Sequence, residues 1–269
     1  MRPEPIRPAE LSDLAELLGS SIQAPESVAW GDARATHRLS LADGRSFALR
    51  RFAGAKANAR AERISRLMSQ LARAGLPVPS PIVAEMPGGP WLLTPWIEGM
   101  TGASWLGDPD RARHLADRMG RLAGRLRTVE LDGDPSDERG VDPPAPDTSE
   151  QRVFVHGDFA PINVVMRDDG EIGALLDFEH AGPGPDLLDT AWWGWVVRHH
   201  HPEAWTAAWP TFLAAGGLDR ERVEGRLHGL VLQTLQDRAA ASDDADDRRR
   251  WQHRLVTARA WTVRDGQAT

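Results

Sequence analysis

The pattern of hydrophobic and polar residues is mixed in the first part of the chain. Residues 5–20 carry leucines at helical spacing, which predicts a short amphipathic helix. Two alternating runs, residues 36–41 and 46–52, lie on either side of Asp43-Gly44, a dipeptide typical of a type I′ hairpin turn. A helix over residues 56–74, rich in Ala, Arg and Leu, and a strand over residues 91–97 complete a small β-rich region.

Beyond residue 97 the pattern becomes mostly helical. A helix is expected over residues 110–129, then a loop of Asp, Gly and Pro to about residue 150, and helices from about residue 186 to the end. A single β-hairpin, residues 153–178, interrupts this region. The pattern therefore predicts an α+β chain with a β-rich lobe over residues 1–97 and a larger, mostly helical lobe over residues 98–269.

Composition narrows the class of protein. The chain has 269 residues, of which 41% are hydrophobic and 26% charged, which is ordinary for a folded globular protein. Its opening residues lack the apolar stretch of a signal peptide, and no apolar run approaches the ~20 residues of a membrane span, so we expect a cytoplasmic protein with no membrane association. A net charge of -7 gives no general attraction for nucleic acid. The absence of cysteine excludes disulfides and thiol nucleophiles. The oligomeric state stays open.

Polar side chains gather at both ends of the hairpin. Asp158 and Asn163 precede its first strand and Asp177 follows its second. If residues 164–166 pair with 172–176 across a turn at Asp169-Gly170, Asn163 faces the residue before Asp177. The side chains of Asn163 and Asp177 would then lie close enough to bind one hard cation such as Mg²⁺. Asp158 would stand beside this cation and meet a substrate hydroxyl. These are the groups that phosphoryl transfer requires.

The motif His156-Gly157-Asp158-x-x-x-x-Asn163, followed by Asp177-Phe178-Glu179, resembles the catalytic and metal-binding loops of the aminoglycoside phosphotransferase and choline kinase families, distant relatives of protein kinases. The resemblance implies a two-lobed protein-kinase-like fold. It implies that Asp158 is the catalytic base and that Asn163 and Asp177 hold Mg²⁺, while His156 braces the loop.

Asp189 resembles the family aspartate that holds the catalytic loop from the next helix. The family usually has Gly-Asp-Pro just before this position, where the present chain has Gly184-Pro185-Asp186, so the alignment of that segment differs.

The resemblance extends to the first lobe. By the period of two, Ala48 and Arg50 lie on one face of their strand, as the Ala and Lys of the kinase Val-Ala-Ile-Lys motif do. An arginine keeps the charge and can grip phosphate with two N–H groups, but it does not replace lysine neutrally. The family pairs this cation with a glutamate on the following helix, and Glu62 is the one acidic residue between Asp43 and Glu85.

The nucleotide contacts are predicted from two further segments. Residues 30–36 stand where a phosphate-covering loop belongs, although they contain one glycine, and Thr36 is a candidate phosphate contact. Residues 93–99 resemble the hinge that reads a purine through main-chain groups, with the Pro95 carbonyl as acceptor and the Ile97 N–H as donor. ATP and GTP are both possible donors.

Three functions follow from these residues. The first is transfer of the γ-phosphoryl group of a nucleoside triphosphate to a hydroxyl of a small molecule, including an antibiotic as in a resistance kinase. The second is a metabolic kinase for choline-like or homoserine-like alcohols, and the third is a nucleotide-binding module without turnover. The tryptophans Trp192, Trp193 and Trp195 are expected in the core, and one of them is a candidate to line an acceptor pocket.

Overall fold

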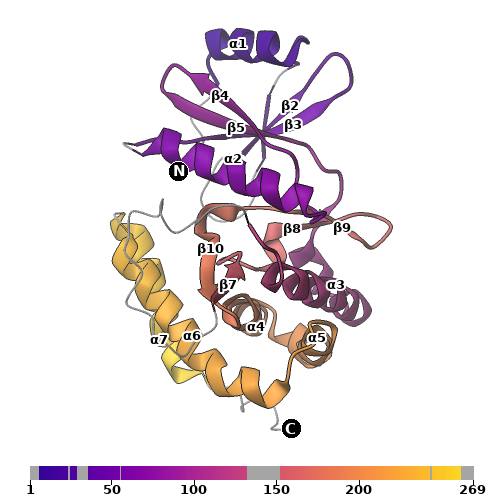
Figure 1. Cartoon of the computed structure of the whole chain (residues 1–269), viewed down its shortest axis with the longest axis vertical. Helices are drawn as coiled ribbons and strands as arrows, with labels where there is room; N and C mark the ends of the chain where they lie inside the picture. Colours follow the sequence, from indigo (N-terminus) through magenta and orange to yellow (C-terminus); the bar gives the residue numbers. More distant parts are fainter. Residues whose placement is uncertain are drawn as a thin grey trace. The chain divides into compact units, whose positions relative to one another are not determined.

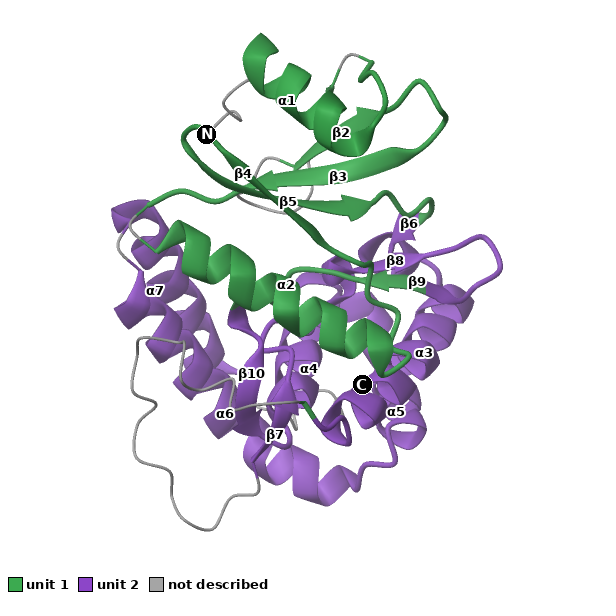
Figure 2. Ribbon diagram, turned by 45° about the horizontal axis from the view of Figure 1, so that its top comes forward, with its two compact units in different colours: residues 1–99, 131–140, 173–179 green, residues 100–130, 141–172, 180–269 purple. Residues whose placement is uncertain are grey.

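The computed structural model describes residues 6–23, 25–28, 36–54, 56–131, 152–242 and 244–261. The chain divides into two compact units, coloured separately in Figure 2. Unit 1 contains residues up to Gly99 and residues 173–179, and unit 2 contains most of the remaining described chain. The division expected from the sequence falls after residue 97 and leaves residues 173–179 in the second lobe.

Unit 1 is built on a five-stranded antiparallel sheet (Figure 1). Its strands, in the order β1-β2-β3-β5-β4, are β1 (Glu26–Val28), β2 (Thr36–Ser40), β3 (Ser46–Arg51), β5 (Gly89–Pro95) and β4 (Ile82–Met86). Two helices accompany it, α1 (Pro8–Leu18) and α2 (Ala57–Arg73). The predicted helices, the hairpin β2–β3 and the strand before the hinge are all present.

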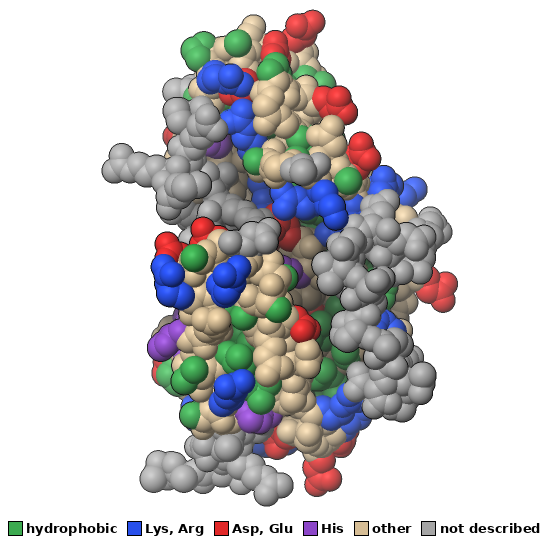
Figure 3. Space-filling model, turned by 90° about the vertical axis from the view of Figure 1, so that its left-hand side faces the viewer, with side chains coloured by type: hydrophobic (Ala, Val, Ile, Leu, Met, Phe, Trp, Pro, Cys, Tyr) green, Lys and Arg blue, Asp and Glu red, His purple; other side chains and the backbone are tan. Residues whose placement is uncertain are grey.

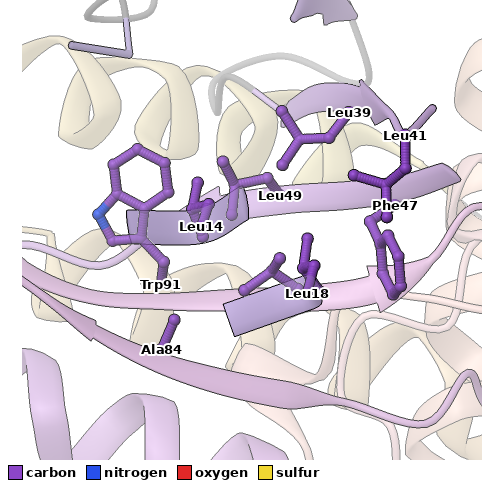
Figure 4. Packing of buried hydrophobic residues seen from close by; sticks show 9 residues of the cluster. Leu14, Leu18, Leu39, Leu41, Phe47, Leu49, Ala84 and Trp91 are labelled. Carbon is purple, nitrogen blue, oxygen red and sulfur yellow. The ribbon is translucent and has the colours of Figure 1, made fainter. Parts of the chain in front are cut away.

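The core of unit 1 follows from the alternation in β3. Phe47 and Leu49 are buried and pack with Leu14 and Leu18 of α1, as Figure 4 shows. Burial of each such side chain contributes about 1.5–3 kcal/mol. Because side chains alternate along a strand, Arg50 belongs to the opposite face from this core. The face that carries Arg50 therefore does not take part in this hydrophobic core.

The Asp43-Gly44 turn differs from the expected type I′ turn. That type needs φ above zero at both central residues, but Gly44 has φ 89° and Asp43 is not among the described residues with positive φ. The Leu41 N–H donates to the Arg45 carbonyl at 2.8 Å, and the Gly44 N–H to the Leu41 carbonyl at 3.1 Å. This is a three-residue turn with a bulged glycine, and Asp43 Oδ1 fixes it by accepting the Arg45 N–H at 2.9 Å.

The strands of unit 2 are short. Two of them, β6 (Met100–Thr101) and β8 (Val164–Met166), belong to a three-stranded sheet with β9 (Ile172–Leu175), which continues beyond the unit, in the order β6-β8-β9. A second pair joins β7 (Arg152–Val155) to β10 (Gly182–Pro185). The sequence Gly-Pro-Gly-Pro of β10 lacks the alternation of a strand, so sequence reasoning missed this pairing.

The hairpin turn between β8 and β9 has the same geometry as the first Asp-Gly turn. The Arg167 N–H donates to the Glu171 carbonyl at 2.9 Å, Gly170 has φ 83°, and Asp169 Oδ1 accepts the Glu171 N–H at 2.9 Å. Arg167 therefore faces Glu171 and not Ile172, so the predicted register was wrong by one residue at the turn. The cause is the same bulged glycine, which a two-residue turn lacks.

Helices make up most of unit 2. They are α3 (Pro109–Arg127), α4 (Leu188–His200), α5 (Pro202–Ala215), α6 (Arg220–Ala241) and α7 (Ala245–Ala260), with short 3₁₀ turns η1 (Gly102–Trp105), η2 (Pro161–Asn163) and η3, Phe178–His180, which begins at the edge of unit 1. The packed pairs include α3 with α5, α4 with α6, and α6 with α7. The helical prediction for this region is confirmed, and the loop expected up to residue 150 lies almost wholly outside the described residues.

Aromatic stacking joins α4 to α5. The ring of Trp193 in α4 stacks on those of Phe212 and Trp209 in α5, with centroids 4.1 Å and 6.2 Å apart. Within α5, the rings of Trp205 and Trp209 also stack, with centroids 4.8 Å apart. Such pairs add about 0.5–1.5 kcal/mol beyond the area that they bury. Trp192, Trp193 and Trp195 are all buried, as expected of core residues.

Charged side chains of both signs are intermixed on the face drawn in Figure 3. On α7, for example, Arg249 pairs with Asp246 and Arg250 with Asp247. Within the described part of the chain, no helix combines the length and the hydrophobicity that crossing a membrane would require.

A buried carboxylate, Glu10, ties α1 to the sheet. It is 2% exposed and accepts hydrogen bonds from the Arg7 N–H at 2.9 Å, from Arg7 Nη2 at 2.6 Å and from Arg51 Nη2 at 2.8 Å. The Arg7 hydrogen bond is the main reason why the pKa of Glu10 lies below its ordinary value, against the opposing effect of burial.

We expect Glu10→Gln to lower the free energy of unfolding by about 1–3 kcal/mol at pH 7, because it removes the charge from three hydrogen bonds. A lowered pKa stabilises the fold above the unfolded-state value and loses this effect as the pH falls through the folded-state value. The difference between wild type and variant in urea unfolding should therefore disappear in acid. A difference that stays constant from neutral to acidic pH would contradict this account.

Candidate active site

The loop over residues 156–163 joins β7 to β8 and is held from below by Asp189, in the first turn of α4. Asp189 Oδ2 accepts the His156 N–H at 2.7 Å, and Oδ1 accepts the Gly157 N–H at 2.9 Å. The carboxylate is buried. Burial raises the pKa of Asp189, while the nearby His156 and the two backbone N–H groups oppose that rise.

The glycine in this loop is required by its conformation. Gly157 has φ 76°, which side chains rarely tolerate, and a Cβ there would collide with the backbone carbonyl of His180. His156 is fully buried, and its Nδ1 accepts the Asp158 N–H at 3.3 Å. In the sequence His-Gly-Asp, the glycine thus permits the turn of the loop, and the histidine accepts the backbone N–H of the aspartate.

Both oxygens of the Asp158 carboxylate are hydrogen-bonded. Oδ1 accepts Trp192 Nε1–H at 2.8 Å and Arg238 Nη2–H at 3.0 Å. Oδ2 accepts Asn163 Nδ2–H at 2.9 Å. The carboxylate is therefore fixed in one orientation by donors that come from elements far apart in the sequence.

The environment keeps Asp158 ionised. Burial is the largest single influence and raises the pKa of Asp158, but Arg238, His180 and His156, together with the Arg238 hydrogen bond, jointly outweigh it, and the net result is a pKa of about 2. At neutral pH this side chain is an acceptor without a proton of its own.

Asn163 is buried at the end of η2. Its Nδ2 donates to the Asp158 backbone carbonyl at 2.8 Å as well as to the Asp158 side chain. In the described part of the chain, nothing donates a hydrogen bond to its Oδ1. This amide oxygen therefore suits a cation ligand, since both amide hydrogens are already used on one side.

In unit 1, Asp177 is held in a strained conformation. Its φ of 65° is the one positive value among the described non-glycine residues, and such a conformation costs of order 1–3 kcal/mol. Arg50 Nη1 donates to Asp177 Oδ1 at 3.0 Å, and Arg50 Nη2 pairs with Glu179. The guanidinium of Arg50 thus bridges the two acids of the Asp-Phe-Glu motif.

The expected pair between Arg50 and Glu62 is not formed. Glu62 is exposed and lies 3.9 Å from Arg66, one helical turn along α2. Its neighbour Arg63 reaches the site instead, with Nη2 donating to the Glu179 backbone carbonyl at 2.9 Å. The acid that pairs with Arg50 comes from the Asp-Phe-Glu motif, two residues after Asp177.

The predicted nucleotide contacts in the described chain lie within, at the ends of or just after strands of unit 1. Ala48 is opposite Thr94 in the β3–β5 pair, and Pro95, at the end of β5, is exposed, whereas Ile97 beyond it is half-buried. Thr36 begins β2. Residues 30–35 of the predicted phosphate loop lie outside the described residues.

The described residues contain no group of three or more His, Cys, Asp or Glu side chains that could enclose a metal ion. The Asn163 amide oxygen and the Asp177 carboxylate are each of the ligand type that suits Mg²⁺, which usually keeps several waters and binds through one or two carboxylates and substrate phosphates. Asn163 belongs to unit 2 and Asp177 to unit 1, so each of the two is described within its own unit.

Two residues in contact with Asp158 were missed as such. Trp192 was predicted to lie in the core with Trp193 and Trp195, and one of these three tryptophans was a candidate to line an acceptor pocket. In the structure, Trp192 contacts Asp158 through its indole N–H. Arg238 carries no local signal, since it lies 80 residues from Asp158 on a helix. The spacing of buried Leu227, Val231 and Leu235 does place Arg238 on the same inward face of α6.

The fold and the loops define a phosphotransferase with a protein-kinase-like architecture. The sequence matches the phosphotransferase enzyme family, APH, over residues 26–144 and 139–228. The chain belongs to this family. The comparison with curated proteins gave no match.

Solved structures with this fold include aminoglycoside and macrolide phosphotransferases. A thermostable mutant of aminoglycoside phosphotransferase APH(4)-Ia, in ternary complex with ADP and hygromycin B, is 17% identical with a TM-score of 0.68 and covers 96% of this chain and 99% of its own. The GDP and kanamycin complex of APH(2″)-IIIa is 13% identical with a TM-score of 0.66, covering 94% and 99%. Macrolide 2′-phosphotransferase MphH from Brachybacterium faecium is 19% identical with a TM-score of 0.64, covering 92% and 97%.

We expect Asp189→Asn to lower the free energy of unfolding by about 1–3 kcal/mol, since the new NH₂ group faces a backbone N–H and leaves that donor unsatisfied. Asp186→Asn is the matched control, because Asp186 pairs with the half-exposed Arg222 and such pairs contribute about 0–1 kcal/mol. Chemical denaturation measures both. Equal losses in the two variants would show that Asp189 does not hold the loop.

Proposed function

We propose that this protein transfers the γ-phosphoryl group of a nucleoside triphosphate to a hydroxyl of a small molecule. The observation that carries the proposal is the Asp158 carboxylate, ionised and fixed through both oxygens, next to Asn163, whose amide oxygen accepts no hydrogen bond from the described residues. Membership of the phosphotransferase family supports it.

In this proposal Asp158 accepts a hydrogen bond from the acceptor hydroxyl and directs its oxygen at the phosphorus. A pKa of about 2 makes Asp158 a weak base towards a free alcohol. Phosphoryl transfer passes through a loose transition state in most analyses, so the hydroxyl becomes acidic only as its bond to phosphorus forms. Asp158 therefore orients the hydroxyl first and takes its proton late in the reaction.

The donor is proposed to bind through a magnesium ion, through Arg50 and through main-chain groups of Pro95 and Ile97. Asn163 and Asp177 would hold Mg²⁺, which neutralises charge on the phosphate oxygens when bound. Arg50, whose guanidinium bridges Asp177 and Glu179, would keep Asp177 in place and turn a free N–H towards phosphate. The Pro95 carbonyl and the Ile97 N–H would read the purine. Structures with this fold carry GDP or ADP, which supports ATP or GTP as the donor.

The acceptor is proposed to be an antibiotic, as in a resistance kinase. Kanamycin and hygromycin B are bound in two structures with this fold, and a third is a macrolide phosphotransferase, which supports this choice. A metabolic alcohol kinase is the second candidate, because the catalytic residues would be the same. A module without turnover is disfavoured by the arrangement of Asp158 and Asn163.

The variant Asp158→Asn tests the proposal, because asparagine has nearly the same shape but cannot take the proton. We expect turnover to fall by about 10²–10⁴-fold, with little change in Mg²⁺-nucleotide affinity. Steady-state kinetics on a panel of antibiotics and alcohols, together with calorimetry of nucleotide binding, would measure both quantities.

Three results would decide against the assignment. Near-normal turnover would remove Asp158 from the mechanism. A joint loss of turnover and nucleotide affinity would make it a structural or metal-site residue. Nucleotide binding without transfer to any acceptor by wild type would favour the module without turnover.

A further inference from the structure

A guanidinium group occupies an aromatic niche directly beside Asp158. The Arg238 side chain is 9% exposed, and its central carbon lies 4.0 Å from the ring centroid of Trp192 and 4.9 Å from that of Trp251. Its Nη2 donates to the Gly157 carbonyl at 2.7 Å and to Asp158 Oδ1 at 3.0 Å. One carboxylate, one carbonyl and two indole rings thus surround a single positive charge. We call these four groups the cation niche.

The cation niche has the composition of a binding site for an organic cation. Indole rings attract cations through the negative potential of their faces, and a carboxylate at the end of the niche adds a full opposite charge. The two rings come from different helices, Trp192 from α4 and Trp251 from α7, with centroids 6.4 Å apart. An ammonium group attached to an acceptor would find the same partners there that Arg238 has.

We propose that Arg238 is a specificity-determining residue, which fills the cation niche from within the chain and so excludes cationic groups from the position next to Asp158. The acceptor whose hydroxyl meets Asp158 is then neutral or anionic next to that hydroxyl. This statement about the acceptor rests on the proposed function. The occupation of the niche by Arg238 is independent of that function.

The charge balance supports this reading. Asp158 contributes one negative charge, which Arg238 compensates at hydrogen-bonding distance. A second cation brought to this carboxylate would meet the guanidinium at close range, where the negative charge of Asp158 is already compensated by Arg238. A carboxylate or a neutral sugar carbon beside the reacting hydroxyl would meet no such repulsion.

The test measures binding of choline and of its uncharged isostere 3,3-dimethyl-1-butanol, without nucleotide, by calorimetry and tryptophan fluorescence. Arg238→Ala empties the niche and leaves Asp158 uncompensated. We expect this variant to bind choline at least about tenfold more tightly than wild type does, and to prefer choline to the isostere by a similar factor. Arg238→Lys keeps a cation in place and should behave as wild type.

Arg254→Ala is the matched control. Arg254 also lies over Trp251, at 4.8 Å from the ring centroid, but it is not among the partners of Asp158. Its removal should leave choline affinity unchanged. If Arg238→Ala is unfolded by circular dichroism, Arg238→Gln removes the charge with less loss of volume, and the same preference for choline is expected.

Wild-type protein that binds choline as tightly as the variants would overturn the proposal, and so would folded charge-removing variants that bind choline no better than the isostere. These outcomes are independent of the proposed function. Failure of wild type to bind Mg²⁺-nucleotide would refute the phosphotransferase assignment while leaving the cation measurement intact.

Discussion

The pair of hydrogen bonds from the His156 and Gly157 N–H groups to the buried carboxylate of Asp189 is the constraint on which the site depends. A buried carboxylate needs donors, and two consecutive N–H groups can point at it only if the chain turns sharply between them. Glycine at residue 157 allows that turn, with its positive φ and its close approach to the His180 carbonyl. Asp158 follows at once and is thereby directed away from Asp189.

The same loop then determines which groups Asp158 meets. The backbone carbonyl and the side chain of Asp158 both accept hydrogen bonds from Asn163 Nδ2, which turns the Asn163 oxygen away from Asp158. Trp192 and Arg238 approach the other carboxylate oxygen. The loop thus sets the position of Asp158, while Trp192 of α4 and Arg238 of α6 fix the orientation of its carboxylate, and Arg238 supplies the compensating positive charge.

Much of the fold and the central motif could be predicted, because both follow from local patterns. The alternation of Phe47 and Leu49 with Ala48 and Arg50 assigns the faces of β3, and the helical periodicities locate the helices. Long-range pairings could not be predicted in this way. Neither the approach of Arg238 to Asp158 nor the pairing of Arg50 with Glu179 has a signal in the spacing of residues.

Turn geometry was the other source of error, and it has a local cause. Both Asp-Gly turns add one residue as a glycine bulge, and in both the aspartate side chain accepts the N–H two residues further on. An aspartate that makes this bond stabilises the longer turn over the two-residue type I′ form. The hydrophobic pattern of the flanking strands does not distinguish the two.

Whether Asp177 holds Mg²⁺ for the nucleotide can be measured by calorimetric titration of a non-hydrolysable nucleoside triphosphate analogue, with Mg²⁺ and with EDTA, into wild type and Asp177→Ala. We expect Mg²⁺ to strengthen nucleotide binding to wild type. Asp177→Ala should lose more than about tenfold of this Mg²⁺-dependent affinity, since loss of a ligand should cost at least as much as loss of a group that orients one. Affinity in EDTA should be nearly equal for the two proteins. Unchanged Mg²⁺-dependent affinity in Asp177→Ala would contradict the account, because the strained aspartate would then hold Arg50 alone and not the metal.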